Sequence, residues 1–231
     1  MLRAIGLTYS FPGSAKPAVA ELALDLSPGE WLAVAGPSGC GKSTLLRLLA
    51  GLRQPQSGLV TLDGAQMPPR SRRAERRGWH RRMLLLPQDT ARAFNPALPL
   101  RGQFRAAMAL HGIGAGAEER DALALDALVR CGVTTPHPLD RHADALSGGQ
   151  RQRAALARLL CLAPRVLLLD EPTAALDPVT ALEVCRLLDG LRKASGGPAL
   201  ITATHLGGTM AQADRVMRMQ AGRLATPGPH N

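Results

Sequence analysis

The chain has 231 residues, of which 45% are hydrophobic and 20% charged, and this balance is enough to bury one sizeable core with an inserted subdomain, or two small domains. It contains no run of about 18 apolar residues and no N-terminal secretory signal, so we expect a cytoplasmic protein without a membrane span. The formal net charge is +10 and the four cysteines are far apart, which permits an anionic partner and indicates neither a disulfide framework nor a zinc site.

The N-terminal part predicts short β-strands separated by turns. Residues 2–8 and 19–26 are typical of an antiparallel edge, because apolar and polar residues partly alternate on either side of a turn rich in Pro, Gly and Ser. The apolar run Trp31 to Ala35 predicts a buried strand. A further short strand is expected at residues 58–62.

A glycine-rich loop follows the strand that ends at Ala35. It matches Gly-x-x-x-x-Gly-Lys-Ser and leads directly into an apolar helix pattern, so successive backbone N–H groups and the helix dipole would converge on an anion. Lys42 would reach the β- and γ-phosphates of a nucleotide, and Ser43 would offer its hydroxyl to Mg²⁺. The candidate phosphate-binding residues are Gly36, Pro37, Ser38, Gly39, Cys40, Gly41, Lys42, Ser43 and Thr44.

Seven arginines crowd residues 70–82. Nucleic acid or an anionic membrane surface would suit such a cluster, but the solvated face of an amphipathic helix explains it as well. Trp79 is the only aromatic residue there and the chain has no nucleic-acid module, so nucleic acid is not expected as a partner. The apolar run Met83 to Leu86 then predicts a buried parallel strand.

The middle third, residues 101–162, predicts helices because Ala, Leu and Arg recur with helical periodicity. Within it, Ser147-Gly148-Gly149-Gln150 precedes a good helix former and predicts a helix start built to meet an anion. Taken alone, Ser147 would simply be a helix cap. Together with the phosphate loop, it gives the chain two anion-ready helix starts.

Two apolar runs in the C-terminal part, residues 166–169 and 200–204, predict buried strands. The first ends in Asp170-Glu171 and the second at His205, and the carboxyl ends of parallel strands are where open α/β sheets bind ligands. Beside a phosphate loop, Asp170 would hold Mg²⁺ and Glu171 would polarise an attacking water molecule.

Six separated motifs together resemble the ATP-binding cassette of ABC transporters. They are, in order, the phosphate loop, Gln88, Leu146 to Gln150, Val166 to Glu171, Ala175 to Asp177, and His205. The resemblance covers nearly the whole chain and implies an α/β fold: a P-loop NTPase (RecA-like) core with an N-terminal antiparallel β-subdomain and an inserted α-helical subdomain. It implies a single ABC ATPase domain with its core at residues 1–88 and 163–231 and its helical signature subdomain at residues 89–162.

The resemblance also implies roles for individual residues. Tyr9 would stack on adenine, Gln88 would sense Mg²⁺ and the attacking water, and His205 would contact the γ-phosphate. The implied catalytic residues are Gln88, Glu171 and His205, and the implied Mg²⁺ ligands are Ser43, Gln88 and Asp170.

A head-to-tail pair of cassettes is a further implication of the resemblance. In such a pair the signature residues of one copy complete the nucleotide site that Lys42 and Glu171 of the other begin. The residues expected to act across the pair are Ser147, Gly148, Gly149, Gln150 and Asp177. The second ATPase subunit would be an identical copy or a sister subunit.

The stretch Gln88-Asp89 followed by Asn95-Pro96 resembles the oligopeptide, dipeptide and nickel uptake cassettes, and the arginine-rich helix expected at residues 72–82 fits that group. This implies an ATPase with ATP and Mg²⁺ as cofactors, peripheral at the cytoplasmic face of the inner membrane. It would power uptake of nickel, peptide or a metal–chelator complex through integral membrane permease subunits, which a solute-binding protein supplies.

A soluble or accessory ABC ATPase that is not coupled to transport is the alternative. It would act on nucleic acid or ribosomes, as the charge of +10 invites, or accompany phosphonate breakdown. Cassettes of the first kind usually carry two copies in one chain or long coiled-coil insertions, which this sequence lacks. Intact Lys42, Asp170, Glu171 and His205 argue against a cassette without hydrolysis.

Overall fold

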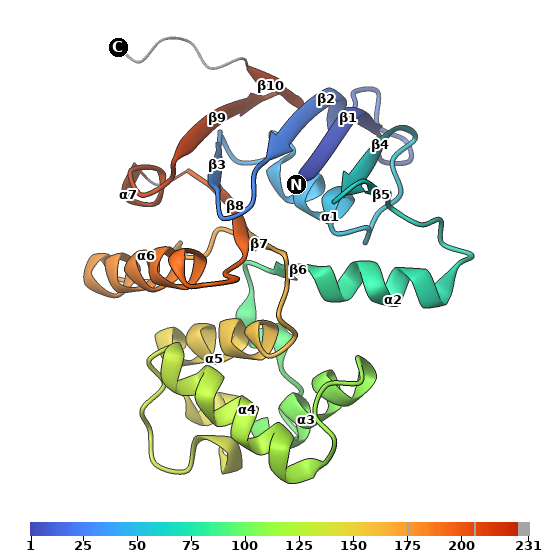
Figure 1. The fold of residues 1–231 in the computed structure, drawn as a ribbon. Helices are drawn as coiled ribbons and strands as arrows, with labels where there is room; N and C mark the ends of the chain where they lie inside the picture. The colour runs from blue at the N-terminus through green and yellow to red at the C-terminus, as the bar shows by residue number, and fades with distance from the viewer. Residues whose placement is uncertain (175, 206, 226–231) are drawn as a thin grey trace.

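The computed structural model describes residues 1–174, 176–205 and 207–225, which form two β-sheets with helices around them (Figure 1). The smaller sheet is antiparallel and runs in the order β2-β1-β4-β5. Its strands are β2 (Val19–Leu26), β1 (Leu2–Tyr9), β4 (Ser57–Leu62) and β5 (Ala65–Gln66). The predicted antiparallel pairing of β1 with β2 is therefore confirmed, although of these two strands β2 lies at an edge of the sheet and β1 lies inside it.

The larger sheet is mostly parallel and forms the centre of the molecule. Its order is β10-β9-β3-β8-β7-β6, and only the pairing of β10 with β9 is antiparallel. The strands are β10 (Arg223–Ala225), β9 (Arg215–Gln220), β3 (Trp31–Ala35), β8 (Ala199–Thr204), β7 (Val166–Asp170) and β6 (Met83–Leu86). All four buried strands expected from apolar runs are confirmed, because β3, β6, β7 and β8 pair as parallel neighbours.

Helices cover both faces of the larger sheet. The α-helices are α1 (Lys42–Leu49), α2 (Arg73–Arg82), α3 (Leu100–Leu110), α4 (Ala117–Arg130), α5 (Gly148–Leu160), α6 (Pro178–Lys193) and α7 (Gly207–Met210). Short 3-10 helices are η1 (Thr90–Ala93), η2 (Pro138–Asp140) and η3 (Ala143–Ala145). The helical character expected for residues 101–162 is confirmed by α3, α4 and α5, which lie together at the end of the molecule away from the smaller sheet (Figure 1).

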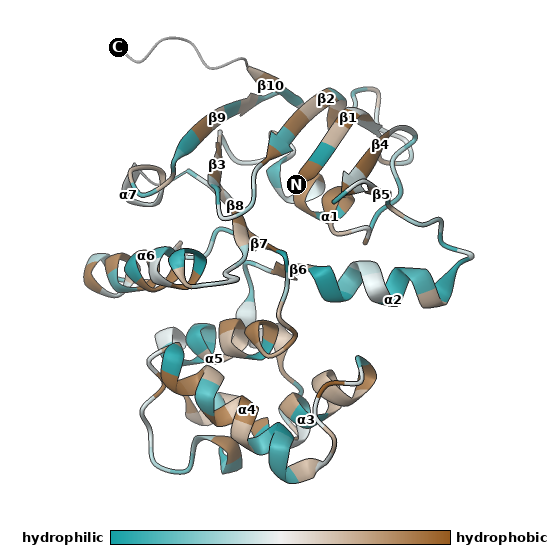
Figure 2. Cartoon of the chain, viewed as in Figure 1, coloured by the Kyte–Doolittle hydropathy of each residue, from teal (hydrophilic) through white to brown (hydrophobic). Residues whose placement is uncertain are grey.

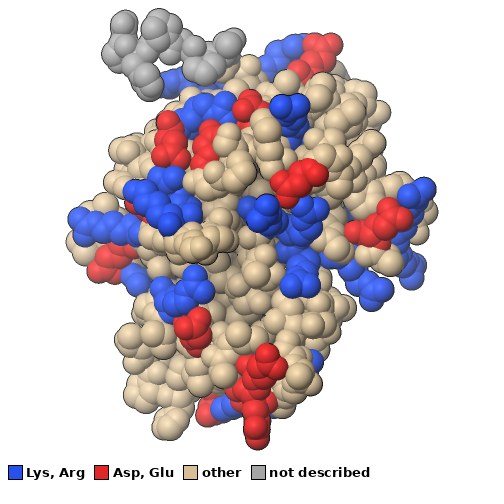
Figure 3. Space-filling model, in the orientation of Figure 1, with Lys and Arg blue, Asp and Glu red and all other residues tan. Residues whose placement is uncertain are grey.

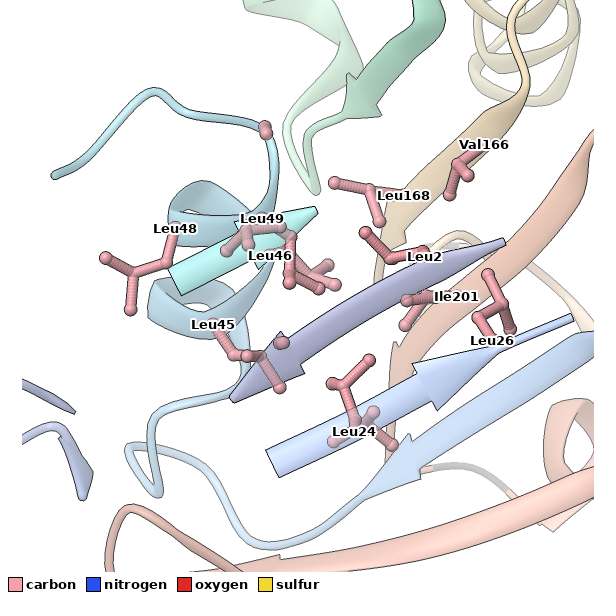
Figure 4. Close-up of a cluster of buried hydrophobic side chains, with 14 of the residues drawn as sticks. Leu2, Leu24, Leu26, Leu45, Leu46, Leu48, Leu49, Val166, Leu168 and Ile201 are labelled. Carbon is pink, nitrogen blue, oxygen red and sulfur yellow. The ribbon is translucent and has the colours of Figure 1, made fainter. Parts of the chain in front are cut away.

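Alternate side chains of β7 enter two separate hydrophobic cores. Val166 and Leu168 join a core between the two sheets, to which α1 contributes four leucines (Figure 4). Leu167 and Leu169 join a second core, which is built with α3, α4, α5 and α6. A strand that is buried on both faces reads as a continuous apolar run, which explains why the sequence revealed these strands clearly.

The arginine-rich helix α2 is hydrophilic along most of its length (Figure 2). Trp79 is its one buried residue, and the indole Nε1 donates to the Leu49 carbonyl oxygen over 3.3 Å. Basic side chains gather on the surface around this helix (Figure 3). The expected solvated helix is therefore present, anchored by a single aromatic side chain. Within the described ranges, no helix is long and apolar enough to cross a bilayer.

Candidate nucleotide site

The phosphate loop connects β3 to α1 as the sequence predicts. Gly41 precedes α1 with φ 113°, a conformation that side chains rarely adopt, and among the described residues no side chain caps this helix. The α1 N–H groups are thus left for a ligand. The Lys42 ammonium is buried and donates to the carbonyl oxygens of Gly36, over 2.7 Å, and of Pro37, over 3.0 Å.

Two glycines of the loop are required by close contacts with neighbouring backbone. A Cβ atom at Gly36 would collide with the Met219 carbonyl oxygen of β9, and one at Gly41 would collide with the Ala18 carbonyl oxygen. The Gly222 N–H also donates to the Cys40 carbonyl oxygen over 3.0 Å. The loop is therefore held from outside by the segment before β2 and by the β9–β10 hairpin.

Ser43 and Asp170 face each other from α1 and the end of β7. The Ser43 hydroxyl donates to Asp170 Oδ1 over 2.9 Å. Burial raises the pKa of the Asp170 carboxyl above its ordinary value, and this outweighs the hydrogen bond from Ser43, which lowers the pKa. A hydroxyl and a partly desolvated carboxylate are hard oxygen ligands, so this pair fits Mg²⁺, which would relieve the cost of keeping Asp170 ionised.

Glu171 and His205 form a second polar pair beside the first. His205 Nδ1 lies 3.1 Å from Glu171 Oε1, and the His205 side chain is 51% exposed. The Glu171 backbone is left-handed with φ 49°, and its N–H donates to the Ala203 carbonyl oxygen over 2.9 Å. Non-glycine residues in this conformation are strained and cluster at functional sites. The carboxylate is thus held at the mouth of the phosphate loop.

One open cleft of about 680 Å³ brings most of the predicted phosphate-loop residues together with Gln88, Glu171 and His205. Its lining comprises Phe11, Ala18, Pro37, Ser38, Gly39, Gly41, Lys42, Ser43, Thr44, Gln88, Glu171 and His205. Gly36 and Cys40 belong to the same loop but do not line the cleft; Gly36 packs against β9 and Cys40 is buried. Ala18 and Phe11 were not predicted from the sequence.

Tyr9, the aromatic residue expected at the nucleotide base, does not line this cleft, and Phe11 does. Tyr9 ends β1, where it pairs with Val19, and its hydroxyl accepts a 2.7 Å hydrogen bond from Arg53 Nη1. Phe11 lies beyond the strand in the turn, with its side chain 37% exposed. Phe11 is therefore the aromatic residue that lines the cleft, and the base-stacking role expected for Tyr9 stays a prediction. The sequence did offer one signal for Phe11, because it is a second aromatic residue only two positions after Tyr9.

The signature residues lie apart from the phosphate loop. Ser147 Oγ accepts from the Gln150 N–H over 3.3 Å, and Gln150 Oε1 accepts from the Ser147 N–H over 3.1 Å, which forms a capping box at the start of α5. Gly148 lines a separate cleft of about 430 Å³, while Gly149 packs near Thr180. Gln88 and Glu171 line both clefts. Within the described chain, the four signature residues do not line the phosphate cleft.

Asp177 caps α6 on the surface. Its carboxylate accepts from the N–H groups of Val179 and Thr180, each over 3.1 Å, and hydrogen bonds from Thr180 are the main cause of its lowered pKa. Ala175, which belongs to the same predicted motif, lies outside the described residues. Asp177 therefore points to the surface and not into the phosphate cleft.

A model of the ABC transporter family matches residues 19–174. The chain is 39% identical over 210 residues to the aliphatic sulfonates import ATP-binding protein SsuB of Cupriavidus necator, covering 89% of this chain and 62% of that protein, less than two thirds of its length. It is 38% identical over 229 residues to the cobalt import ATP-binding protein CbiO of Rhodobacter capsulatus, covering 99% of this chain and 78% of that protein.

Among solved structures, the chain is similar to the ATP-binding cassette MJ0796 in a dimeric, post-hydrolysis state bound to ADP and Pi. The TM-score is 0.86 and the identity 25%, with 98% of this chain and 97% of that chain covered. This similarity confirms the expected core, antiparallel β-subdomain and helical subdomain. The family match, the two relatives and the shared fold agree, so the chain belongs to the ABC transporter family and has the fold of an ATP-binding cassette.

Proposed function

We propose that this chain binds Mg²⁺-ATP in the phosphate cleft and hydrolyses it to drive import across a membrane. The observation that carries the proposal is the convergence in one cleft of the buried Lys42, Ser43 and Glu171, with Asp170 hydrogen-bonded to Ser43 behind the lining. These groups provide phosphate binding, magnesium ligands and a general base, the parts that phosphoryl transfer to water requires.

Each side chain takes one role in the proposed reaction. Lys42 exchanges its two loop carbonyl partners for phosphate oxygens, and the N–H groups of α1 bind the same phosphates. Glu171 orients the attacking water and accepts its proton, while His205 leaves Glu171 to contact the γ-phosphate. Gln88 lies between both clefts, where it would contact Mg²⁺ and the water. Bound Mg²⁺ would neutralise charge that develops on the phosphate oxygens.

A second cassette completes the proposed site. Ser147 and Gly148 are exposed, and Ser147, Gly149 and Gln150 stay away from the phosphate cleft of their own chain. Such residues are available to the cleft of a partner, and the similar MJ0796 cassette is dimeric. Asp177, which is exposed at the start of α6, would contact the partner as well. The partner would be a second copy or a sister ATPase.

The composite site predicts that turnover depends on protein concentration. Hydrolysis per chain should rise with concentration below the dimerisation constant and reach a plateau above it, because each cleft needs a partner's signature residues. Measuring phosphate release and molecular mass over the same dilution series tests this. Full hydrolysis per chain by protein that remains monomeric would contradict the proposal.

Peptide, nickel or a metal–chelator complex is the cargo class we propose. The resemblance of Gln88-Asp89 and Asn95-Pro96 to uptake cassettes for peptides and nickel supports it, and the similar CbiO protein has cobalt import in its name. The chain itself would lie at the cytoplasmic face of the membrane beside permease subunits, supplied by a solute-binding protein. We also propose residues 89–162 as the helical subdomain, because α3, α4 and α5 share the second hydrophobic core.

Aliphatic sulfonates are the second candidate cargo, since the similar SsuB protein has their import in its name. Uptake of radiolabelled nickel, a dipeptide and an alkanesulfonate by a deletion strain, each offered separately, discriminates the candidates. Loss of nickel or dipeptide uptake supports the proposal, and loss of sulfonate uptake alone supports the second candidate. Normal uptake of all three would favour a cassette that is not coupled to transport.

A further inference from the structure

The loop that follows α1 is fastened to both the phosphate-binding helix and the turn that carries Phe11. The Arg53 N–H donates to the Arg47 carbonyl oxygen in α1 over 3.1 Å. Three residues further on, the Gln56 N–H donates to the Thr8 carbonyl oxygen over 2.9 Å, and Gln56 Oε1 accepts from the Ser10 N–H over 2.8 Å. The loop therefore sets the position of residues 8–11 relative to the phosphate loop.

Arg53 contacts both aromatic rings of this turn. Its guanidinium carbon lies 4.8 Å from the centre of the Phe11 ring and 5.4 Å from the centre of the Tyr9 ring. Nη1 donates to the Tyr9 hydroxyl, and the two rings meet edge to face with centres 5.2 Å apart and planes at 86°. The cation and the two rings thus form one cluster at the rim of the phosphate cleft.

The guanidinium is held in this cluster at the expense of a hydrogen bond. Arg53 Nε is buried, and no hydrogen-bond partner for it exists among the described residues. A buried donor without a partner is unfavourable, so the contacts with the two rings and the Tyr9 hydroxyl determine where the guanidinium lies. The guanidinium packs over the ring of Phe11, and the same residue lines the cleft.

We propose that Arg53 is a positioning residue for the nucleotide base. It clamps the Phe11 ring from behind, so that the ring forms a rigid platform on which adenine stacks. This inference rests on the proposed binding of ATP in the cleft. A platform that is already immobilised loses less side-chain entropy when the base binds, and the guanidinium contact adds a cation–π attraction that keeps the ring in place.

The clamp acts on the base and not on the phosphates. Arg53 follows the C-terminal end of α1, whereas Lys42 and Ser43 stand at the N-terminal end of the same helix. A ligand that has the phosphates but lacks the base should therefore bind independently of Arg53. Inorganic tripolyphosphate with Mg²⁺ is such a ligand.

The test compares the binding of Mg²⁺-ATP and of Mg²⁺-tripolyphosphate to the full chain by titration calorimetry. Arg53→Ala should weaken ATP binding by about two- to fivefold, the size of an exposed cation–π contact, and leave tripolyphosphate binding unchanged. The KM for ATP should rise by the same factor while kcat stays constant. Arg53→Lys should recover part of the ATP affinity, because it keeps the charge but lacks the planar group.

Two controls separate positioning from a general loss of structure. Arg70→Ala removes an exposed arginine and should change neither affinity, and thermal unfolding should show each variant to be folded. In a Phe11→Ala background, Arg53→Ala should have no further effect on ATP binding, because the platform is already gone. Arg53→Lys, which perturbs packing least, keeps the test decisive if Arg53→Ala does not fold.

Several outcomes would overturn the inference. Equal losses of ATP and tripolyphosphate affinity, or an undiminished effect of Arg53→Ala in the Phe11→Ala background, would show that Arg53 acts elsewhere. If Arg53→Lys and Arg53→Ala both fold and both bind ATP as tightly as the wild type, Arg53 does not position the base. That result would leave the proposed ATPase function intact. A wild-type chain that binds tripolyphosphate but not ATP would remove both the inference and the proposed function.

Discussion

The helix starts of α1 and α5 are both rich in glycine, yet they are completed in different ways. At α1, Gly41 takes a left-handed conformation, and no side chain in the described chain caps the first turn. At α5, Ser147 and Gln150 satisfy each other's backbone N–H groups in a capping box. The first start therefore depends on a ligand for its hydrogen bonds, whereas the second is stable as a helix cap on an exposed surface.

This difference suggests how the N-terminal ends of α1 and α5 contribute to the proposed nucleotide site. The α1 end brings Lys42 and Ser43 to the cleft, with Asp170 hydrogen-bonded to Ser43, so in the proposed mechanism it binds phosphates before any partner arrives. The α5 end stays outside that cleft and is presented at the surface. Variants at the two ends should therefore separate nucleotide binding from turnover, and we give them from the largest expected effect to the smallest.

Glu171→Gln should abolish turnover while nucleotide binding persists. Loss of the general base is expected to lower kcat by about 10²–10⁴-fold, because the attacking water is no longer deprotonated. The ATP-bound dimer should accumulate, which size-exclusion chromatography with Mg²⁺-ATP would detect. Glu118→Gln, in the first turn of α4, is the matched control and should behave as the wild type. More than about a tenth of the original rate would count against the role of Glu171.

Ser147→Arg should block hydrolysis at the α5 end without affecting binding at the α1 end. A bulky side chain would keep the helix start from the partner's phosphates, with an expected loss of about 10²–10³-fold in kcat, as for removal of one donor to a developing charge. Phosphate release and nucleotide affinity should be measured together. Ser147→Thr keeps the cap and serves as the control. Unchanged hydrolysis by Ser147→Arg would exclude the shared site.

Lys42→Ala should weaken nucleotide binding itself. A charged hydrogen-bond donor to phosphate is removed, so the affinity for Mg²⁺-ATP should fall by about ten- to a hundredfold in calorimetry. Lys193→Ala is the control, since Lys193 only forms an exposed ion pair with Asp189. If Lys42→Ala binds ATP normally, the α1 end is not the primary phosphate site.

Asp170→Asn should change how stability depends on pH, which is the smallest effect of the four. Because burial raises the pKa of Asp170 above 3.8, the folded chain holds this proton more tightly than the unfolded chain. Without Mg²⁺, the free energy of unfolding should therefore fall as pH rises through the interval between 3.8 and the raised pKa. Asp170→Asn should lack that fall. Denaturant unfolding at several pH values measures the free energy of unfolding of both proteins. Identical pH profiles for the wild type and Asp170→Asn would contradict the prediction.

The elements that the sequence predicted best are strands with a clear apolar pattern, either a continuous run or an alternation. Val19–Leu26, Trp31–Ala35 and Met83–Leu86 are observed with the expected bounds, because apolar runs or alternation end at turn residues. Strand β9 was not predicted, since Arg215 to Gln220 mixes Arg and Met without a clear period. It exists because β3 offers a parallel partner, which is a tertiary effect.

The candidate site divides in the same way. The residues from Pro37 to Ser43 that line the cleft follow from one local motif, so their convergence could be anticipated. Which aromatic residue lines the cleft could not be anticipated from the sequence. Whether Tyr9 or Phe11 does so depends on the conformation of the turn after β1, where Arg53 contacts both rings. Spacing along a chain does not specify which of two nearby side chains faces a ligand.

The left-handed backbone of Glu171 places its proposed catalytic role and heat resistance in conflict at one position. Glycine there would relieve strain of about 1 kcal/mol and would remove the carboxylate at the same time. In a gene copy that is selected only for a folded product and no longer for turnover, Glu171→Gly would be favoured. Loss of the acid should thus be an early step when such a cassette decays into a purely structural subunit.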